Sequence, residues 1–509
     1  MCYGLRGWAI EAFGTSIVKV SPHSTLTWNI ECLRRILSST MDGALIIAGI
    51  LSVFVFLVLV AIKRNQYWSD QGVRQWKPLL FVGDVLPVIL RRQTFGQLIM
   101  EICRALPNEP VIGFYFFMKP ILIMNDIELV QRVFVKDFPH FTNRRRQPDV
   151  ERDPQQFMHM TLFNTNGKLW RAIRSKFQPM FTNGKLKLMF PQVLDISDYF
   201  IELLKKESQN TNKIDMTEYF GKFTMEVLGA TAFGLNGRAM DENSEFRENG
   251  KKLIEPSLAN FMRYMVAPSL VQTLGIPPMP GIMRSYFGRI VKNALKTRRE
   301  SNVKRHDFLQ HMVTLQEKGF IEVEKEDANE EMSETERGPE MKVEMSDELM
   351  IGQASGFILA GFDTTALTMA WMCYDLASNP EIQTKIREEA REVLSKHGNR
   401  MDYDTTKEMK YLIKCLKESS RLHVILDAFF RMVSKPYNVP GTSAVLRTGD
   451  YVYIPVLDIH MNPKFYPDPE KFDPERWTED DRPACTHLPF GAGPRVCIGT
   501  SDSRYTILL

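Results

Sequence analysis

The chain is short of cysteine and of net charge. Its 509 residues include seven cysteines, and 64 basic side chains stand against 61 acidic ones, which leaves a formal charge of +3. The cysteines are scattered, odd in number and without a Cys-x-x-Cys pair, which argues against a disulfide framework and a structural zinc site. So small a charge leaves no electrostatic footprint for nucleic acid. No internal repeat is visible, so we expect one large domain or a few ordinary ones.

One segment has no charge and no polar face. Residues 43–62 form an uncharged apolar run of 20 residues, and as a helix it would span about 30 Å, the thickness of the hydrocarbon core of a bilayer. A buried core helix and a cleaved signal peptide both fit this length and position poorly. Lys63 and Arg64 follow at once, which favours a cytoplasmic C-terminal part. We therefore expect a transmembrane anchor over residues 42–63.

The anchor divides the chain into unequal parts. Residues 1–41 are rich in serine and threonine and are treated as an N-terminal extension of unknown role. Residues 64–77 are expected to be a polar linker, and residues 78–509 a folded domain. Within that domain, residues 321–345 are strongly acidic and offer little that could form a core, so we expect a solvated surface loop there.

The pattern of the folded part is mainly helical, with a small β component. Residues 346–377 contain no proline and begin with a good N-cap, Ser346, which predicts a helix of about 48 Å. Residues 360–365 at its centre include glycine, aspartate and two threonines, and a threonine hydroxyl there can bond back to a carbonyl and open the helix. A Thr-x-x-Glu capping box at residues 405–408 predicts a further helix that continues to Arg421. Short β-type runs lie at residues 111–115, 121–124 and 451–455.

The most specific chemistry lies near the end of the chain. Residues 490–499 read Phe-Gly-Ala-Gly-Pro-Arg-Val-Cys-Ile-Gly, a glycine-rich loop that carries Arg495 and Cys497. Glycines let the backbone approach something flat and bulky, a guanidinium suits a carboxylate, and a lone thiolate can ligate haem iron. The loop alone fits a haem site and a glycine-rich turn with a buried structural cysteine equally well.

Four further motifs occur before this loop. Each is weak by itself: a helix with Trp170 and Arg174 on one face, for example, also fits an exposed basic face with one buried tryptophan. In this order and together with the cysteine loop, the motifs resemble the cytochrome P450 family of haem-thiolate monooxygenases over about residues 77–499. The five motifs are Trp170-x-x-x-Arg174, Ala360-Gly361-x-Asp363-Thr364-Thr365, Glu418-x-x-Arg421, Phe472-x-Pro474-Glu475-Arg476 and Phe490-Gly491-x-Gly493-x-Arg495-x-Cys497-x-Gly499.

The resemblance implies how a haem would be held. Cys497 would be the axial thiolate ligand of haem b, and Phe490 would contact the haem. The side chains that would hold the haem propionates are Trp170, Arg174, Arg431 and Arg495.

The resemblance also implies roles around the haem. Asp363 and Thr364 would relay protons to bound oxygen above it, whereas Thr365 would be structural. Ala360 and Phe362 would face the substrate pocket. The buried ion-pair cluster that fixes the core would consist of Glu418, Arg421 and Arg476.

The implied fold is mainly α with a small β-sheet region, the cytochrome P450 fold, behind a single N-terminal transmembrane helix. Finer matches such as Phe141-Thr142-Asn143-Arg144 resemble the animal microsomal branch, whose members oxidise drugs and steroids. The implied activity is an NADPH- and O₂-dependent hydroxylation of a lipophilic molecule (xenobiotic, steroid or fatty-acid-like). Electrons would come from an NADPH-dependent flavoprotein reductase. The protein would be a single-pass protein of the endoplasmic reticulum membrane, with the catalytic domain facing the cytosol.

The end of the chain departs from the family pattern. In the family a long helix and a terminal hairpin follow the cysteine loop, whereas 12 residues follow Cys497 here, too few to form a stable helix unaided. We therefore expect a C-terminally truncated form. Two alternatives follow: a truncated isoform with impaired haem binding and no catalysis, or a haem-thiolate isomerase or synthase that needs no reductase. The intact Asp363–Thr364 pair disfavours the second alternative.

Overall fold

The chain divides into two compact units, Met1–Arg64 and Asn65–Leu509. The computed structural model describes residues 47–144, 160–234, 239–241, 244–254, 286–301, 305, 307–322, 342–479 and 481–500. In the first unit the described residues are helical, and side chains such as Ile50, Phe54 and Phe56 are more than half exposed. A candidate membrane span covers Ile47–Gln71, with a mean hydropathy of 2.3. The predicted extension 1–41 and the start of the predicted anchor lie outside the described residues.

A second long apolar helix, Asp347–Ser378, also has the length and composition of a membrane span. This helix runs through the core of the second unit, where Met350, Ala354 and Ile358 are at most 1% exposed. Burial inside the protein therefore accounts for its apolar character.

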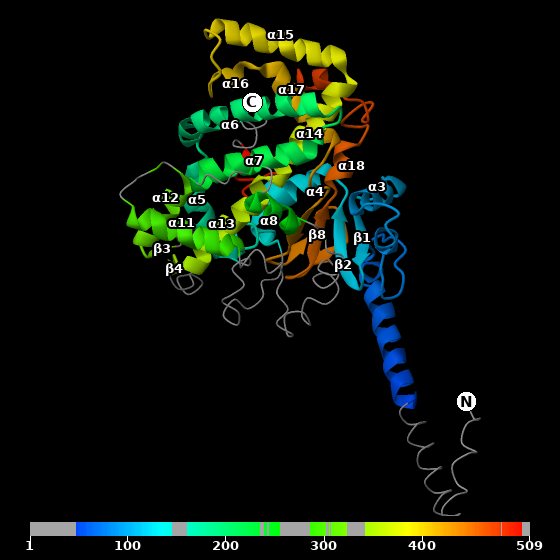
Figure 1. Ribbon diagram of the computed structural model, residues 1–509. Coiled ribbons are helices and arrows are strands. Elements are labelled where there is room, and N and C mark those ends of the chain that lie inside the picture. The colour runs from blue at the N-terminus through cyan, green and yellow to red at the C-terminus, as the bar shows by residue number, and fades with distance from the viewer. Residues whose placement is uncertain are drawn as a thin grey trace, which may run out of the picture. The chain divides into compact units, whose positions relative to one another are not determined.

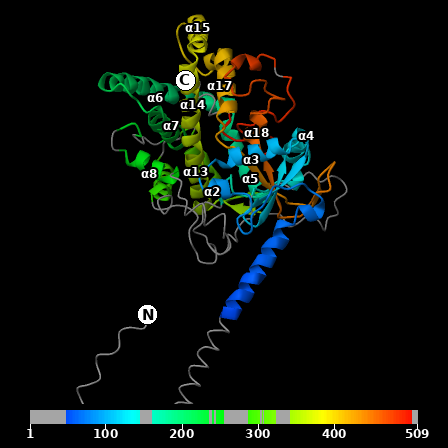
Figure 2. The ribbon, with the colours of Figure 1, turned by 90° about the vertical axis from the view of Figure 1, so that its right-hand side faces the viewer.

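The second unit combines many helices with a four-stranded mixed sheet in the order β1-β2-β8-β5. Its strands are β1 (Val111–Phe116), β2 (Lys119–Met124), β5 (Phe429–Met432) and β8 (Tyr451–Ile454). β1 and β2 form a hairpin, β2 pairs with β8 in parallel, and β8 pairs with β5 antiparallel. Figures 1 and 2 show this sheet with α3 (Phe95–Ala105) on one side of the unit and α6 (Asn183–Asn210) and α7 (Met216–Phe233) on the other. The predicted strands 111–115, 121–124 and 451–455 are confirmed within a residue or two.

Helices account for most of the remaining structure, as the sequence predicts. Several begin at a side-chain cap: Thr94 and Gln97 form a capping box on α3, and Ser346 caps α13. The other α-helices are α2 (Leu86–Ile89), α4 (Ile127–Gln131), α5 (Gly167–Phe177), α8 (Glu245–Ile254), α11 (Gly288–Glu300), α12 (Phe308–Glu317), α13 (Asp347–Gly361), α14 (Asp363–Ser378), α15 (Pro380–Lys396), α16 (Thr405–Glu408), α17 (Lys410–Leu422) and α18 (Val456–His460).

The predicted linker is part of the folded unit. Trp68 is fully buried, and a Cβ on Gly113 of β1 would lie 2.7 Å from its side chain. The Gly113 amide donates to the Arg74 carbonyl at 2.8 Å, and the Trp76 amide donates to the Gly113 carbonyl at 3.0 Å. Gln75 therefore forms a single parallel bridge to Gly113 of β1, and Trp68 packs against the same glycine.

The predicted acidic loop 321–345 is ordered at its two ends. β3 (Phe320–Glu322) and β4 (Lys342–Glu344) pair antiparallel, with Ile321 opposite Val343. Both of these central side chains are buried, so the ends are held by apolar contact. The middle of the predicted loop, residues 323–341, lies outside the described residues.

The predicted helix from Thr405 to Arg421 is wrong as one element. The chain breaks at Met409, between α16 and α17. The first free amides of α17, at Tyr411 and Leu412, donate to the Glu389 carboxylate of α15 at 2.7 and 2.9 Å. A carboxylate from a neighbouring helix caps this N-terminus, and sequence spacing does not reveal such a partner.

Candidate functional site

The cysteine loop has a shape that glycine alone permits at two positions. Gly491 and Gly493 have φ values of 72° and 70°, which side chains rarely tolerate. A Cβ on Gly493 would overlap the Phe134 carbonyl oxygen. The Cys497 amide donates to the Phe490 carbonyl at 3.0 Å, which closes the loop. The backbone thus presents Cys497 from a fixed turn.

Cys497 opens into a cavity of about 430 Å³. Its side chain is exposed, and the space that it faces is this cavity within the fold. Burial raises the pKa of its thiol, whereas the Gly499 amide and the guanidinium groups of Arg174 and Arg144 lower it. At this position, a cation bound in the cavity, and not water, would stabilise the thiolate form of Cys497. Most of the cavity wall is apolar and includes Leu162, Phe181, Leu228, Phe357 and Leu426.

Four arginines lie together near Cys497. Arg174 donates to the Val496 carbonyl at 2.9 Å, Arg495 to the Thr165 carbonyl at 2.6 Å, and Arg144 to the Arg495 carbonyl at 3.3 Å. The fourth is Arg431 of β5, which is 1% exposed. In the described part of the chain, none of the four forms an ion pair with a carboxylate. Nitrogens of Arg144, Arg431 and Arg495 are buried without a hydrogen-bond partner among the described residues.

Such a cluster is electrostatically incomplete. Burial lowers the pKa of Arg431 to about 9, and burial together with the other three guanidinium groups lowers that of Arg495 to about 8. Like charges and orphaned donors are costly in an interior unless an anion joins them. The arrangement therefore fits an anionic ligand with several acceptor oxygens.

The structure brings most of the predicted haem-binding residues to this cavity. Trp170, Arg174, Phe490, Arg495 and Cys497 all line it, and the Arg495 guanidinium lies 4.3 Å from the Trp170 ring centroid. Arg431 lies behind the wall and acts on Arg495 through its charge.

Arg144 also lines the cavity, and the sequence reasoning did not assign it to the haem. The motif Phe141-Thr142-Asn143-Arg144 was read only as a mark of the family branch. The arginine that ends this motif was the available signal.

The central helix is open beside the cavity, as its composition predicts. α13 ends at Gly361 and α14 begins at Asp363. The Thr364 hydroxyl donates to the Ala360 carbonyl at 2.7 Å, and the Phe362 carbonyl accepts from the Thr224 hydroxyl of α7 at 2.9 Å. The Thr364 hydroxyl thus bonds back to a carbonyl at the break, whereas the Phe362 carbonyl accepts from the Thr224 hydroxyl in addition to the Ala366 amide at 3.0 Å.

The two members of the predicted proton relay face different surroundings. Thr364 lines the cavity, together with Ala360, Gly361 and Thr365. Asp363 lies outside the cavity wall; burial raises the pKa of its carboxyl, and the charge of Arg247 on α8 opposes the shift. The expectation that Phe362 faces the pocket is wrong: its side chain is fully buried in the core around α7 and α13.

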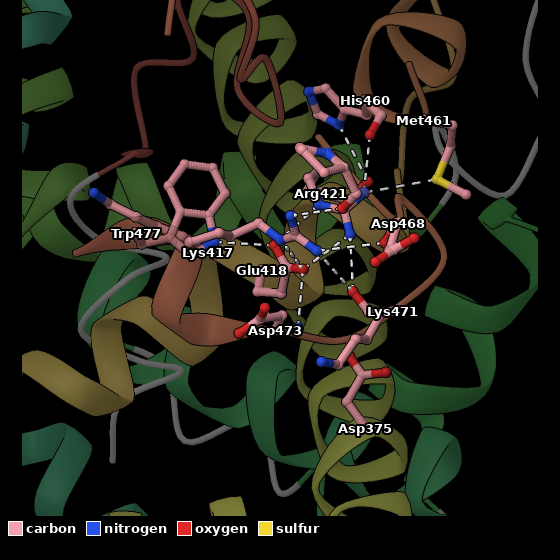
Figure 3. Close-up of polar contacts among 12 residues, drawn as sticks. Asp375, Lys417, Glu418, Arg421, His460, Met461, Asp468, Lys471, Asp473 and Trp477 are labelled. Atoms are coloured by element: carbon pink, nitrogen blue, oxygen red, sulfur yellow. Dashed lines mark hydrogen bonds and ion pairs between the residues drawn. The ribbon is translucent and has the colours of Figure 1, made fainter. Parts of the chain in front are cut away.

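The predicted ion-pair cluster is present, with Glu418 and Arg421 at its centre (Figure 3). Arg421 donates to both oxygens of the Glu418 carboxylate at 2.9 Å, and Arg476 donates to Oε1 at 2.8 Å. The Trp477 indole and the Asp473 amide complete the shell at 3.0 and 3.1 Å. Five donors therefore neutralise and solvate one buried carboxylate.

His460 joins this cluster to the cysteine loop. The Leu488 amide donates to His460 Nε2 at 2.7 Å, so the proton of the neutral ring is on Nδ1, which donates to the Arg421 carbonyl at 3.2 Å. Burial lowers the pKa of His460 to about 3. One neutral imidazole thereby fixes the backbone before the cysteine loop against the helix that carries Glu418.

A cysteine that opens into an apolar cavity beside unpaired buried arginines, in a mainly helical unit, has the features of a haem-thiolate protein. Comparison with known proteins agrees. The cytochrome P450 family model matches residues 73–502. Cytochrome P450 6B2 of Helicoverpa armigera is 31% identical over 467 residues, 91% of this chain and 89% of the relative. Probable cytochrome P450 6a18 of Drosophila melanogaster is 32% identical over 468 residues, 88% of this chain and 89% of the relative.

This chain belongs to the cytochrome P450 family. The family resemblance stated from the motifs is thereby confirmed, as is the mainly helical fold with small sheets. Family membership supports a haem- and iron-binding monooxygenase, an oxidoreductase that uses NADPH and O₂ through a reductase.

Proposed function

We propose that this protein is an NADPH- and O₂-dependent haem-thiolate monooxygenase that hydroxylates lipophilic small molecules of the xenobiotic, steroid or fatty-acid type. The observation that carries the proposal is Cys497 at the wall of an apolar cavity with a cluster of unpaired buried arginines beside it. The relatives' names give the family and name no substrate.

The residues present fit haem b. Cys497 would ligate the iron, and the flat ring system would occupy the apolar space beside Phe490. The propionates would supply the missing anions for Arg174, Arg431 and Arg495, with Trp170 alongside them and Arg144 as a further donor. When bound, the haem with its thiolate ligand supplies the activation of O₂.

The chain's own groups around the helix opening can move protons. The Thr364 hydroxyl donates its hydrogen to the Ala360 carbonyl, so its oxygen can accept a hydrogen bond from a group or water in the cavity and hold it in place for proton transfer. Asp363 is one residue away and its raised pKa favours proton retention. We assign Thr364 to the delivery of protons and Asp363 to their supply, with Thr365 as a structural residue.

The surroundings of the site indicate which substrate, electron donor and membrane the protein would use. The apolar wall favours a lipophilic substrate, since burial of apolar surface provides most of its binding free energy. Electrons would come from an NADPH-dependent flavoprotein reductase. The apolar part of the candidate span Ile47–Gln71, which ends at Ile62, fits a single-pass anchor in the endoplasmic reticulum membrane, with the catalytic unit in the cytosol.

The test is the difference spectrum of the reduced, CO-bound full-length protein in detergent or nanodiscs. We expect the red-shifted Soret band of thiolate ligation, and its loss in Cys497→Ser. Cys103→Ser, which changes a buried cysteine far from the motif, is the matched control. A wild-type protein with no haem signal would leave the alternative of an impaired form. A haem signal without NADPH consumption in the presence of the reductase would favour an isomerase or synthase.

A further inference from the structure

The loop before α5 is fastened to the central helix by one buried amide. Gln353 of α13 is 1% exposed. The Leu162 amide donates to Gln353 Oε1 at 2.9 Å, and Gln353 Nε2 donates to the Met160 carbonyl. Both ends of the side-chain amide therefore pair with the backbone of residues 160–162, as a neighbouring β-strand would.

The helix and the loop are also in close van der Waals contact. A Cβ on Gly356, three residues after Gln353 and on the same helix face, would lie 3.0 Å from Thr161 Cγ2. Thr161 is 2% exposed, and its carbonyl accepts from the amides of Asn164 and Thr165 at 2.9 Å. The loop is thus a compact turn that rests on α13, with glycine at the point of closest approach.

The same loop forms part of the cavity wall. Leu162 and Phe163 line the cavity, and Phe163 is 59% exposed there. The Arg144 guanidinium lies 4.1 Å from the Phe163 ring centroid. At the other end of the loop, the Thr165 carbonyl accepts from Arg495 at 2.6 Å. The loop is therefore fixed at one end to α13 and at the other end to the cysteine loop.

We infer that Gln353 is a positioning residue that sets ligand specificity by holding Leu162 and Phe163 on the cavity wall. The inference rests on the proposed function, since it concerns the ligands of a haem-containing cavity. Gln353 itself lies on the cavity wall, but both polar ends of its side chain pair with the backbone of residues 160–162. Among the described residues it has no hydrogen bond to Cys497 or Thr364, so its loss should change which ligands fit and leave the haem in place. Bulky ligands that reach the loop should be affected, whereas small ones should not.

The experiment compares Gln353→Leu and Gln353→Glu with the wild-type protein. Leucine removes both hydrogen bonds at similar volume, whereas glutamate keeps the acceptor for the Leu162 amide. Ser355→Ala is the matched control, because Ser355 is a buried residue of α13 whose hydroxyl has no hydrogen-bond partner among the described residues. The readouts are hydrogen exchange over residues 160–166 and spectral titration of the full-length holoprotein with imidazole and with 1-phenylimidazole.

In Gln353→Leu we expect exchange at the loop about tenfold faster and 1-phenylimidazole binding about fivefold weaker, with imidazole binding unchanged. Gln353→Glu should regain part of the protection, and Ser355→Ala should match the wild type. An unchanged ratio of the two dissociation constants overturns the inference, as does unchanged exchange in both variants. If Gln353→Leu does not fold, the same ratio in Gln353→Glu decides. A wild-type protein without haem signal overturns the proposed function and this inference together, whereas an unchanged ratio with intact haem overturns this inference alone.

Discussion

The Glu418 carboxylate and the Arg421 guanidinium form a bidentate pair in which neither side chain has any exposed surface. The pair is three residues apart on α17, yet its remaining partners come from other segments. Arg421 also donates to the His460 carbonyl at 2.9 Å, and Glu418 accepts from Arg476 and Trp477. The cluster therefore joins α17, α18 and the segment at residues 473–477 into one support for the cysteine loop (Figure 3).

Arg421→Lys should lower the free energy of unfolding by about 3 kcal/mol. A lysine cannot donate to both oxygens of the buried Glu418 carboxylate as the guanidinium does, and the His460 carbonyl loses its donor. We expect a clearly lower thermal midpoint and less haem per protein. Lys385→Gln is the control, since its pair with Glu475 is more than half exposed on both sides and 3.4 Å long, and it should leave the midpoint unchanged. Equal midpoints for the two variants would contradict a structural role for the cluster.

His460 makes the fold sensitive to acid. Its pKa is about 3 in the folded chain and about 6.5 when unfolded. The unfolded state therefore binds more protons as the pH falls below about 6.5, and stability is lost toward pH 3 at up to about 1.4 kcal/mol per pH unit. His460→Gln keeps a donor and an acceptor but does not titrate. His460→Gln should be less stable than the wild type at pH 7.5. The difference between the thermal midpoints of the two proteins should be smaller at pH 5. If this difference is the same at both pH values, His460 does not titrate on unfolding.

The sequence was sufficient wherever a local pattern decides the structure. Residues of three motifs, among them Trp170, Thr364 and Cys497, line one cavity, and the threonines predicted an opening in the central helix. The sequence could not predict the partners that other segments provide, such as Glu389 on the first turn of α17 and Thr224 on the Phe362 carbonyl. These contacts join residues far apart in the chain.

Two residues of the proposals were not singled out for the same reason. Arg144 and Gln353 have ordinary spacings in the sequence, and what marks them is their contact with distant backbone, at Arg495 and at residues 160–162. The apparent linker at residues 65–77 was misread because the burial of Trp68 depends on the absence of a side chain at Gly113. Composition shows which residues are polar, but it does not show which surface of the fold a given side chain packs against.

Arg144→Leu should separate the stability of the apoprotein from its affinity for haem. Removal of one charge from a group of four, of which Arg431 and Arg495 are buried, relieves repulsion, so the apoprotein should unfold at the same or a higher temperature. The haem should leave faster, because one donor to its propionates is lost. Transfer of haem to an excess of an acceptor globin measures the rate, and we expect an increase of at least about threefold. Lys205→Gln, which removes an exposed positive charge from α6, should change neither quantity, and unchanged transfer in Arg144→Leu would remove Arg144 from the haem site.

Thr364→Ala tests the proton path at the helix opening. The variant loses the hydroxyl that faces the cavity and is fixed to the Ala360 carbonyl, so haem should bind normally while protons arrive later than electrons. We expect NADPH consumption to continue with a larger share of hydrogen peroxide and at least about a threefold smaller yield of product per NADPH, a lower bound that lies well below the ~10²-fold and larger gains of positioned acid–base groups. Thr384→Ala is the matched control: its hydroxyl makes the same bond to a carbonyl one turn earlier, at 3.0 Å to Pro380, on the exposed face of α15. Equal coupling in the two variants would show that the hydroxyl of Thr364 serves only to open the helix.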